Sequence, residues 1–155
     1  MSVFAKDTTV AVERSRAEIE RMLTRYGASK FASGWDERGA TIMFEASNRR
    51  IRFSLALPLL GDKRFDRDGR GSTRNPAQRI AAREQACRQK WRALALVIKA
   101  KLEAVDSGIT SFETEFLAHV VLPNGGTVGE CVGAQLAAAY ESGAMPPLLL
   151  GTGAP

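Results

Sequence analysis

Residues 41–57 read TIMFEASNRRIRFSLAL, and this stretch decides the fold. Apolar side chains alternate with polar ones on both sides of a Ser-Asn pair, at Ile42 and Phe44 before it and at Ile51 and Phe53 after it. A period of two predicts β-strands that are apolar on one face. Serine and asparagine supply a tight turn, so the two strands are expected to form an antiparallel hairpin.

A third strand precedes the hairpin in the segment KFASGWDERG, where Phe31 and Trp35 fall at alternate positions and turn residues follow. The three segments predict an antiparallel meander. One face of this sheet is apolar and needs helices against it, whereas the other face carries Arg50 and Arg52 and is expected to meet water.

Two helices are predicted to cover the apolar face. The first spans about residues 10–26, with Val12, Ile19 and Leu23 on one side at helical spacing and Gly27 just past its end. The second is much longer and starts with an asparagine cap, a proline at the first position and Gln78 in a capping box. Its apolar stripe continues for roughly 45 Å before Gly108. The stripe consists of Ile80, Cys87, Trp91, Leu94, Ile98, Leu102 and Val105.

Two shorter helices are predicted near the C-terminus. Thr110 with Glu113, and Thr127 with Glu130, have the spacing of capping boxes. The first of these helices is expected at about 111–121, and the second, VGECVGAQLAAAYESG, has Gly143 at its end. Both helices are expected to complete the core.

The predicted fold class is therefore α+β, with an αβββα core: a three-stranded antiparallel sheet, one long amphipathic helix and two short C-terminal helices. Residues 1–155 are expected to form a single domain. Residues 58–75 are predicted to be a flexible basic loop, and residues 144–155 an apolar, Pro-rich tail.

The net charge of +5 conceals a strong asymmetry. Residues 1–48 contain seven basic and seven acidic side chains, residues 49–101 contain fifteen and four, and residues 102–155 contain none and six. The three segments therefore carry net charges of 0, +11 and −6. A segment this basic predicts a polyanionic partner, and nucleic acid is the main candidate.

The predicted nucleic-acid-binding residues fall into three groups. They are Arg50 and Arg52 on the sheet, Lys63, Arg64, Phe65, Arg67, Arg70 and Arg74 in the loop, and Arg79, Arg83 and Lys90 on the long helix. Because the groups are adjacent in sequence, they are expected to form one surface. The ring of Phe65 either stacks on an unpaired base or folds back on the protein.

Other interpretations of the charges remain open. The basic patch can be a solvated face that Asp62, Asp66 and Asp68 partly neutralise. Alternatively, the acidic segment lies against the basic segment, either within one chain or between the chains of a homo-oligomer such as a ring or filament.

No catalytic constellation is recognisable, and no cofactor or metal is predicted. His119 lies among apolar residues without a nucleophile near it in sequence and is read as a half-buried histidine. The segment DRDGRG has part of the spacing of a calcium loop, but Arg64 and Asn75 occupy its first and twelfth positions. GRGSTR lacks the end of a phosphate-binding Walker loop. Asp106, Glu113 and Glu115 are candidate ligands of a metal site, but no further feature of the sequence supports one.

Cys87 and Cys131 are expected to be small core residues. The chain shows neither a secretion signal nor an apolar run long enough to cross a bilayer, so a cytoplasmic location in the host cell and no membrane partner are expected.

The segments RYGASKFASGW, QKWRALALVIKAKLEAV, FETEFLAHVVLPNGGTVGE and MPPLL resemble a family of small proteins from tailed phages and prophages, over nearly the whole chain. The resemblance implies a phage setting, with DNA replication, recombination or counter-defence as possible purposes. In the order of its elements alone, the chain also resembles the double-stranded-RNA-binding domain and the single-strand annealing proteins of phages.

The sequence therefore predicts a non-enzymatic, phage-type protein that binds nucleic acid, single-stranded DNA in particular, during replication or recombination. The alternative is a phage-encoded inhibitor or adaptor that binds a host protein, such as a defence protein, and that functions as a homo-oligomer.

Overall fold

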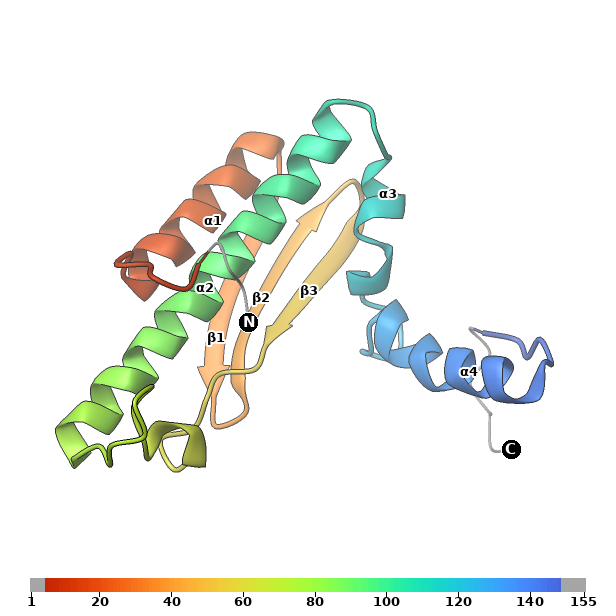
Figure 1. Ribbon diagram of the computed structural model, residues 1–155. Helices are drawn as coiled ribbons and strands as arrows, with labels where there is room; N and C mark the ends of the chain where they lie inside the picture. Colours follow the sequence, from red (N-terminus) through yellow and green to blue (C-terminus); the bar gives the residue numbers. More distant parts are fainter. Residues whose placement is uncertain (1–4, 149–155) are drawn as a thin grey trace.

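The computed structural model describes residues 5–148, which form an antiparallel sheet, two helices on one face of it and a C-terminal helix that points away from it (Figure 1). The strands are β1 (Lys30–Asp36), β2 (Gly39–Ala46) and β3 (Arg49–Leu55), in the spatial order β1-β2-β3. The predicted three-stranded meander and the α+β class are confirmed.

The turn between β2 and β3 fixes the register of the hairpin. Ser47 and Asn48 both have positive φ angles, 51° and 59°, as a type I′ turn requires. Phe44 then lies opposite Ile51, and both side chains are buried on the inner face. A slip by one residue would turn every inner side chain toward solvent, so burial and turn geometry specify the same register.

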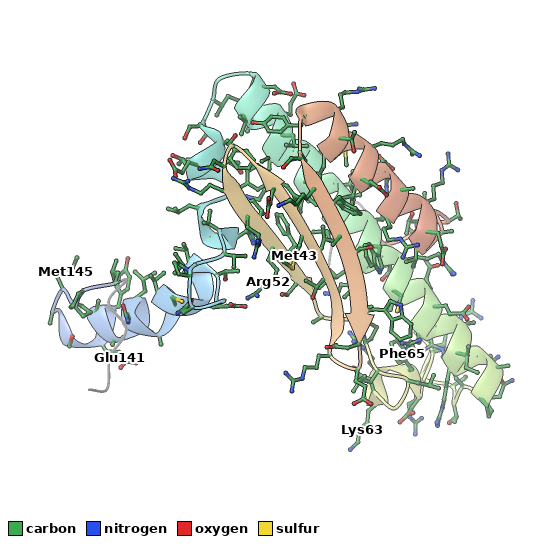
Figure 2. The ribbon with its side chains drawn as sticks, turned by 180° about the vertical axis from the view of Figure 1, so that it is seen from behind. Met43, Arg52, Lys63, Phe65, Glu141 and Met145 are labelled. Atoms are coloured by element: carbon green, nitrogen blue, oxygen red, sulfur yellow. The ribbon has the colours of Figure 1, made fainter. Side chains whose placement is uncertain are left out.

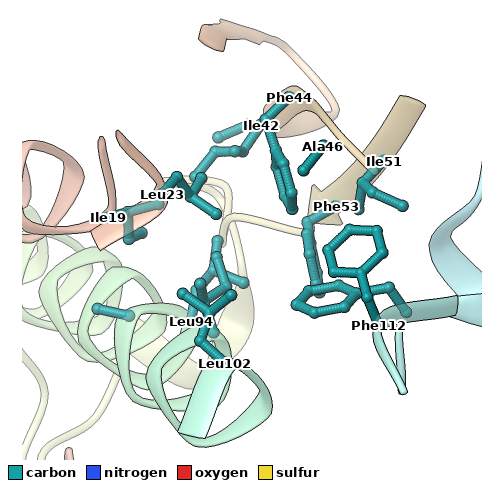
Figure 3. Close-up of a cluster of buried hydrophobic side chains, with 14 of the residues drawn as sticks. Ile19, Leu23, Ile42, Phe44, Ala46, Ile51, Phe53, Leu94, Leu102 and Phe112 are labelled. Carbon is teal, nitrogen blue, oxygen red and sulfur yellow. The ribbon is translucent and has the colours of Figure 1, made fainter. Parts of the chain in front are cut away.

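Helices α1 (Val12–Tyr26) and α2 (Pro76–Asp106) cover the inner face of the sheet (Figures 1 and 3). Ile19 and Leu23 of α1 and Ile98 of α2 have no exposed surface. Burial of each such side chain contributes about 1.5–3 kcal/mol. The three side chains belong to one hydrophobic core with the inner face of the sheet.

Helix α2 begins where the sequence predicts. The Asn75 side chain accepts the N–H of Gln78 at 2.9 Å, and the Gln78 side chain accepts the N–H of Asn75 at 2.9 Å. Pro76 occupies the first helical position. At the other end, Gly108 has a φ of 77°, a left-handed conformation that favours glycine.

The buried residues of α2 all lie between Trp91 and Leu102. The N-terminal half of this 31-residue helix extends past the end of the sheet, where the loop that precedes α2 lies against it (Figure 1). Across residues 5–148, no helix is both long and apolar enough to span a membrane.

The helix predicted at 111–121 is present only in part. The structure has a single turn, α3 (Phe112–Glu115), followed by a 3₁₀ turn, η2 (Leu117–His119). The capping residue is Ser111, whose hydroxyl accepts the N–H of Thr114 at 3.2 Å, rather than Thr110.

The chain leaves the helical conformation after η2 because it joins the edge of the sheet. The N–H of Val121 donates to the carbonyl of Arg50 on β3 at 2.8 Å. Phe112, Phe116 and Val120 are buried, so this segment does complete the core. Competition from sheet pairing therefore shortened a helix that local sequence favoured.

Helix α4 (Val128–Ser142) begins and ends where predicted, with a capping box between Thr127 and Glu130 and a left-handed Gly143. Only its first residue, Val128, packs against the core, which corrects the expectation that this helix completes it. Within the described chain, none of its residues is buried, and the helix points away from the sheet (Figure 1). Apolar composition predicted a packed helix but could not identify its partner.

The predicted C-terminal tail is described only as far as Leu148, and residues 149–155 lie outside the described residues. Pro146 and Leu148 are partly covered, whereas Met145 is exposed.

Ser15 gives a test of the packing between α1 and α2. It is 0% exposed, and its Oγ has no hydrogen-bond partner among the described residues. A buried hydroxyl without a partner costs about 1–3 kcal/mol, so Ser15→Ala is expected to raise the free energy of unfolding by about 1 kcal/mol. Urea denaturation measures this change. Ser33→Ala, at an exposed strand position, is the control and should change stability by less than about 0.5 kcal/mol. A loss of stability in Ser15→Ala would contradict the description of Ser15 Oγ as a buried hydroxyl without a hydrogen-bond partner.

Candidate nucleic-acid interface

Aspartates within the basic loop hold its backbone turns. Asp62 Oδ1 accepts the N–H of Arg64 at 3.1 Å, which caps the 3₁₀ turn η1 (Lys63–Phe65). Asp68 Oδ1 accepts the N–H of Arg70 at 2.9 Å. The flexibility predicted for residues 58–75 stays a prediction, but in this structure the loop follows defined turns.

The loop packs against the part of α2 that extends past the sheet. Phe65 is only 4% exposed, and its ring lies beside α2 in Figure 2, so it folds back on the protein and does not offer a face to a base. Arg83 Nε donates to the carbonyl of Pro58 at 3.0 Å, and Arg79 pairs with Asp66 at 3.2 Å. Phe65, Arg79 and Arg83, all predicted to bind nucleic acid, thus hold the loop on the helix.

A cleft of about 710 Å³ lies between this loop, α2 and the N-terminal segment. Phe65, Ala86 and Ala93 give it apolar walls. The basic residues around it are Lys6, Arg64, Arg74 and Lys90. Apolar walls with cations at the rim suit a ligand that has a flat apolar part and a negative charge.

Two features of this cleft were not predicted from the sequence. Gln85 donates a side-chain hydrogen bond to the carbonyl of Thr8 at 2.9 Å, and Gln89 donates one to the carbonyl of Lys6. These bonds bring Lys6 beside the cleft, and no local pattern indicates them. The small residues Ala82, Ala86 and Ala93 do fall on one side of α2, and their spacing was the available signal for a helix face without bulky side chains.

The cations near the cleft differ in whether a carboxylate neutralises them. Lys63, Arg70 and Lys90 are exposed, and in the described part of the chain none of them forms an ion pair. Arg67 and Arg74 donate to backbone carbonyls at 2.9 and 2.8 Å. Lys63 points away from the sheet (Figure 2). Arg64, by contrast, pairs with Asp62 at 2.9 Å. Most of the positive charge around the loop is thus available to a ligand.

Arg50 and Arg52 belong to a different surface. They lie on the outer face of the sheet, which separates them from α2 (Figure 2). Glu45 pairs with Lys30 at 2.7 Å and with Arg50 at 3.1 Å, and the bond from Lys30, followed by that from Arg50, lowers the pKa of Glu45. Arg52 pairs with Glu130 at 2.7 Å. The expectation of a single contiguous surface is therefore corrected, and these two arginines have carboxylate partners.

Part of the acidic C-terminal segment neutralises the basic segment within the same chain. The pairs are Arg49 with Glu113 at 2.8 Å, Arg52 with Glu130 at 2.7 Å and Lys101 with Glu115 at 3.0 Å. Glu103, Asp106 and Glu141 form no ion pair with the residues that the structure describes. Intramolecular pairing thus uses cations outside the loop, and the cations around the cleft are left without these partners.

His119 packs against an aromatic ring. Its imidazole stacks on Phe53 with ring centroids 4.0 Å apart. Burial lowers the pKa of His119 below its ordinary value of 6.5, and the positive charge of Lys101 lowers it further. These contacts give the side chain a packing role.

The acidic residues considered for a metal site are separately engaged, since Glu113 and Glu115 form ion pairs. Over residues 5–148, no group of three His, Cys, Asp or Glu side chains is placed to hold a metal ion. Cys87 and Cys131 are only partly buried, less than expected for core residues, and burial raises the pKa of the Cys87 thiol.

Comparisons of the chain with protein-family models, with curated proteins and with solved structures found no match. The function is therefore inferred from the geometry and charge of the chain itself.

The packing of His119 predicts a pH dependence of stability. Because its pKa is lower in the folded protein than its ordinary value of 6.5, the unfolded chain binds more protons near that pH. Stability should therefore fall as the pH drops from about 7.5 to 5.5. Chemical denaturation across this range measures the effect. His119 is the only histidine in the chain, so His119→Gln should remove most of the slope. If the stability of His119→Gln depends on pH as steeply as that of the wild type, His119 is not the source of the pH dependence.

Proposed function

We propose that the protein binds single-stranded nucleic acid, DNA in particular, without catalysis, through one surface beside α2. We call this surface the loop–helix track. It consists of Lys63, Arg64, Arg67, Arg70, Arg74 and Lys90. The observation that carries the proposal is a cleft of about 710 Å³ with apolar walls next to exposed cations that lack carboxylate partners in the described chain.

The cations of the track supply the electrostatic part of binding. Each Lys or Arg that meets a phosphate releases condensed counterions, with a dependence of about −0.7 in log K per log salt for each phosphate of a single strand. Four contacts, from Lys63, Arg67, Arg70 and Lys90, would give a slope of roughly −3. Binding of this kind tolerates any sequence, since phosphates carry no sequence information.

The apolar walls of the cleft favour a single strand over a duplex. Bases in a duplex are stacked and paired, whereas an unpaired base can enter an apolar pocket. Ala86 and Ala93 leave room along α2 for a flat ring. The guanidinium of Arg64 lies 5.1 Å from the centroid of the Phe65 ring, and Phe65 supports it from below. A planar guanidinium can stack on a base, so Arg64 takes the contact first expected of Phe65.

We further propose a phage setting, with a role in DNA replication or recombination, on the sequence resemblance alone. A sequence-tolerant single-strand binder suits both processes, because each exposes single strands of arbitrary sequence.

The proposal predicts salt-dependent binding to a fluorescent oligonucleotide. Fluorescence anisotropy should show binding at about 50 mM salt and a loss of roughly 60-fold in affinity at about 200 mM, as a slope of about −3 requires. The triple variant Lys63→Gln, Arg70→Gln, Lys90→Gln should bind more weakly and should reduce the slope by about 2. Ala86→Leu, which narrows the cleft, should weaken binding to single strands more than to a duplex.

A charge-matched control is available on α1. The variant Arg14→Gln, Arg21→Gln, Arg25→Gln removes three exposed arginines that do not line the cleft and should leave affinity and slope nearly unchanged. Equal losses in both triple variants would mean that net charge, not the track, drives binding. No binding at about 50 mM salt, or binding without salt dependence, would overturn the proposal.

A further inference from the structure

Helix α4 exposes apolar side chains that the described chain does not cover. Leu136 is 44% exposed and Tyr140 89%, and Met145, which follows the helix, is 86% exposed. A short helix in water is marginally stable on its own, and most helices are stabilised by packing of an apolar face. An apolar helix of 15 residues with no buried side chain in the described chain therefore lacks the packing that such helices usually have.

The base of α4 is fixed to the body, so the helix extends at a defined angle. The N–H of Val128 donates to the carbonyl of Val120 at 2.9 Å, and Glu130 pairs with Arg52 on β3 at 2.7 Å. Gly129 lies so close to the body that an added Cβ would come within 3.0 Å of the carbonyl oxygen of Ala118. These contacts hold the first turn only, and the remainder projects like an arm (Figure 1).

The outer face of the sheet offers a surface that such an arm can cover. Figure 2 looks onto this face and shows Met43 and Arg52 on it, with no helix over them. Ala32 lies beside Met43 in the sheet, and a hollow of about 490 Å³ is lined by both of them together with Lys30, Glu45 and Arg50. Its floor is apolar and its rim is charged.

Charge and length both match the arm to this face. Among residues 102–155 there are six acidic side chains and no basic one, and Glu141 near the end of α4 has no ion pair in the described chain. The rim of the hollow carries Lys30 and Arg50, which share the single carboxylate of Glu45, so the rim keeps one net positive charge. Helix α4, with 15 residues, is roughly 22 Å long, and strand β1, with 7 residues, is roughly 23 Å long.

The arm cannot reach the outer face of its own chain, because its first turn is fixed at the edge of the sheet and the helix points away. We propose that α4 docks on the outer sheet face of a second copy of the chain. Leu136 and Tyr140 would cover Ala32 and Met43, and Glu141 would approach Lys30 and Arg50. When two copies exchange arms, the contact occurs twice, as in a closed dimer with two-fold symmetry. This inference does not depend on the proposed nucleic-acid binding.

The first test is the mass in solution. Light scattering on the full chain at about 100 µM should give at least twice the monomer mass of 16.8 kDa. The arm variant is the double substitution Leu136→Glu, Tyr140→Glu, and the face variant is Met43→Glu. Each should return the mass to 16.8 kDa. Ile109→Glu is the control and should keep the wild-type mass. Ile109 is 81% exposed and belongs neither to α4 nor to the outer face of the sheet. Circular dichroism checks that each variant is folded.

The second test identifies the contact directly. In a background with Cys87→Ala and Cys131→Ala, one chain carries Ala32→Cys and another carries Leu136→Cys. Mixing the two under mild oxidation should form a disulfide-linked pair of different chains, whereas either chain alone should form far less. Gly34→Cys in place of Ala32→Cys reports the neighbouring outer-face position, and Ser33→Cys, on the opposite face of β1, should not cross-link.

The outcomes separate this inference from the proposed function. A monomeric wild-type chain would overturn it, and so would arm variants that keep the wild-type mass. A third outcome would also overturn the docking on the outer face. If the arm variant becomes monomeric but Met43→Glu does not, and no cross-link to residue 32 forms, then α4 binds a different surface. The arm variant should still bind a single-stranded oligonucleotide with salt dependence at high protein concentration, since the loop–helix track lies past the end of the sheet, away from α4 (Figure 1).

Discussion

Helix α2 is longer than the sheet that it covers, and this mismatch organises the rest of the molecule. Its 31 residues span roughly 46 Å, whereas the 8 residues of β2 span roughly 26 Å. The sheet buries only the part of α2 from Trp91 to Leu102. The N-terminal half needs another cover, and the loop supplies it through buried Phe65 and Pro58. The basic residues of the loop therefore lie against the N-terminal half of α2, which the sheet does not cover.

Patterns between close neighbours in the sequence predicted most of the fold. The capping boxes at Asn75 and Thr127 are present, and the alternation around the Ser-Asn turn gave the correct hairpin. The errors came where two elements compete or where packing is at long range. Sheet pairing of Val121 ended the helix predicted at 111–121. A lone aromatic such as Phe65 has no periodicity, so its direction was not predictable from sequence.

The candidate site was predictable as a charge imbalance but not as a surface. Sequence counts treat all basic residues alike, whereas the fold pairs some of them with distant carboxylates. Arg52 meets Glu130, 78 positions away, and Lys101 meets Glu115. Exposed ion pairs of this kind contribute little to stability, about 0–1 kcal/mol each. Their larger effect is on the electrostatic surface, because they remove positive charge from the sheet and leave it concentrated around the loop.

The two candidate surfaces are separate, since one lies on the outer sheet face and the other on the part of α2 past the end of the sheet, and this has a functional consequence. In the proposed function, a track with about four unpaired cations would bind a single strand weakly at physiological salt, since each phosphate contact is partly screened. If arms exchange across the outer sheet faces, each particle carries two tracks. A strand held by the first track then meets the second at an effective concentration in the millimolar range. Affinity would rise by avidity without additional contacts in either cleft, so the apolar arm and the basic loop would act in one function.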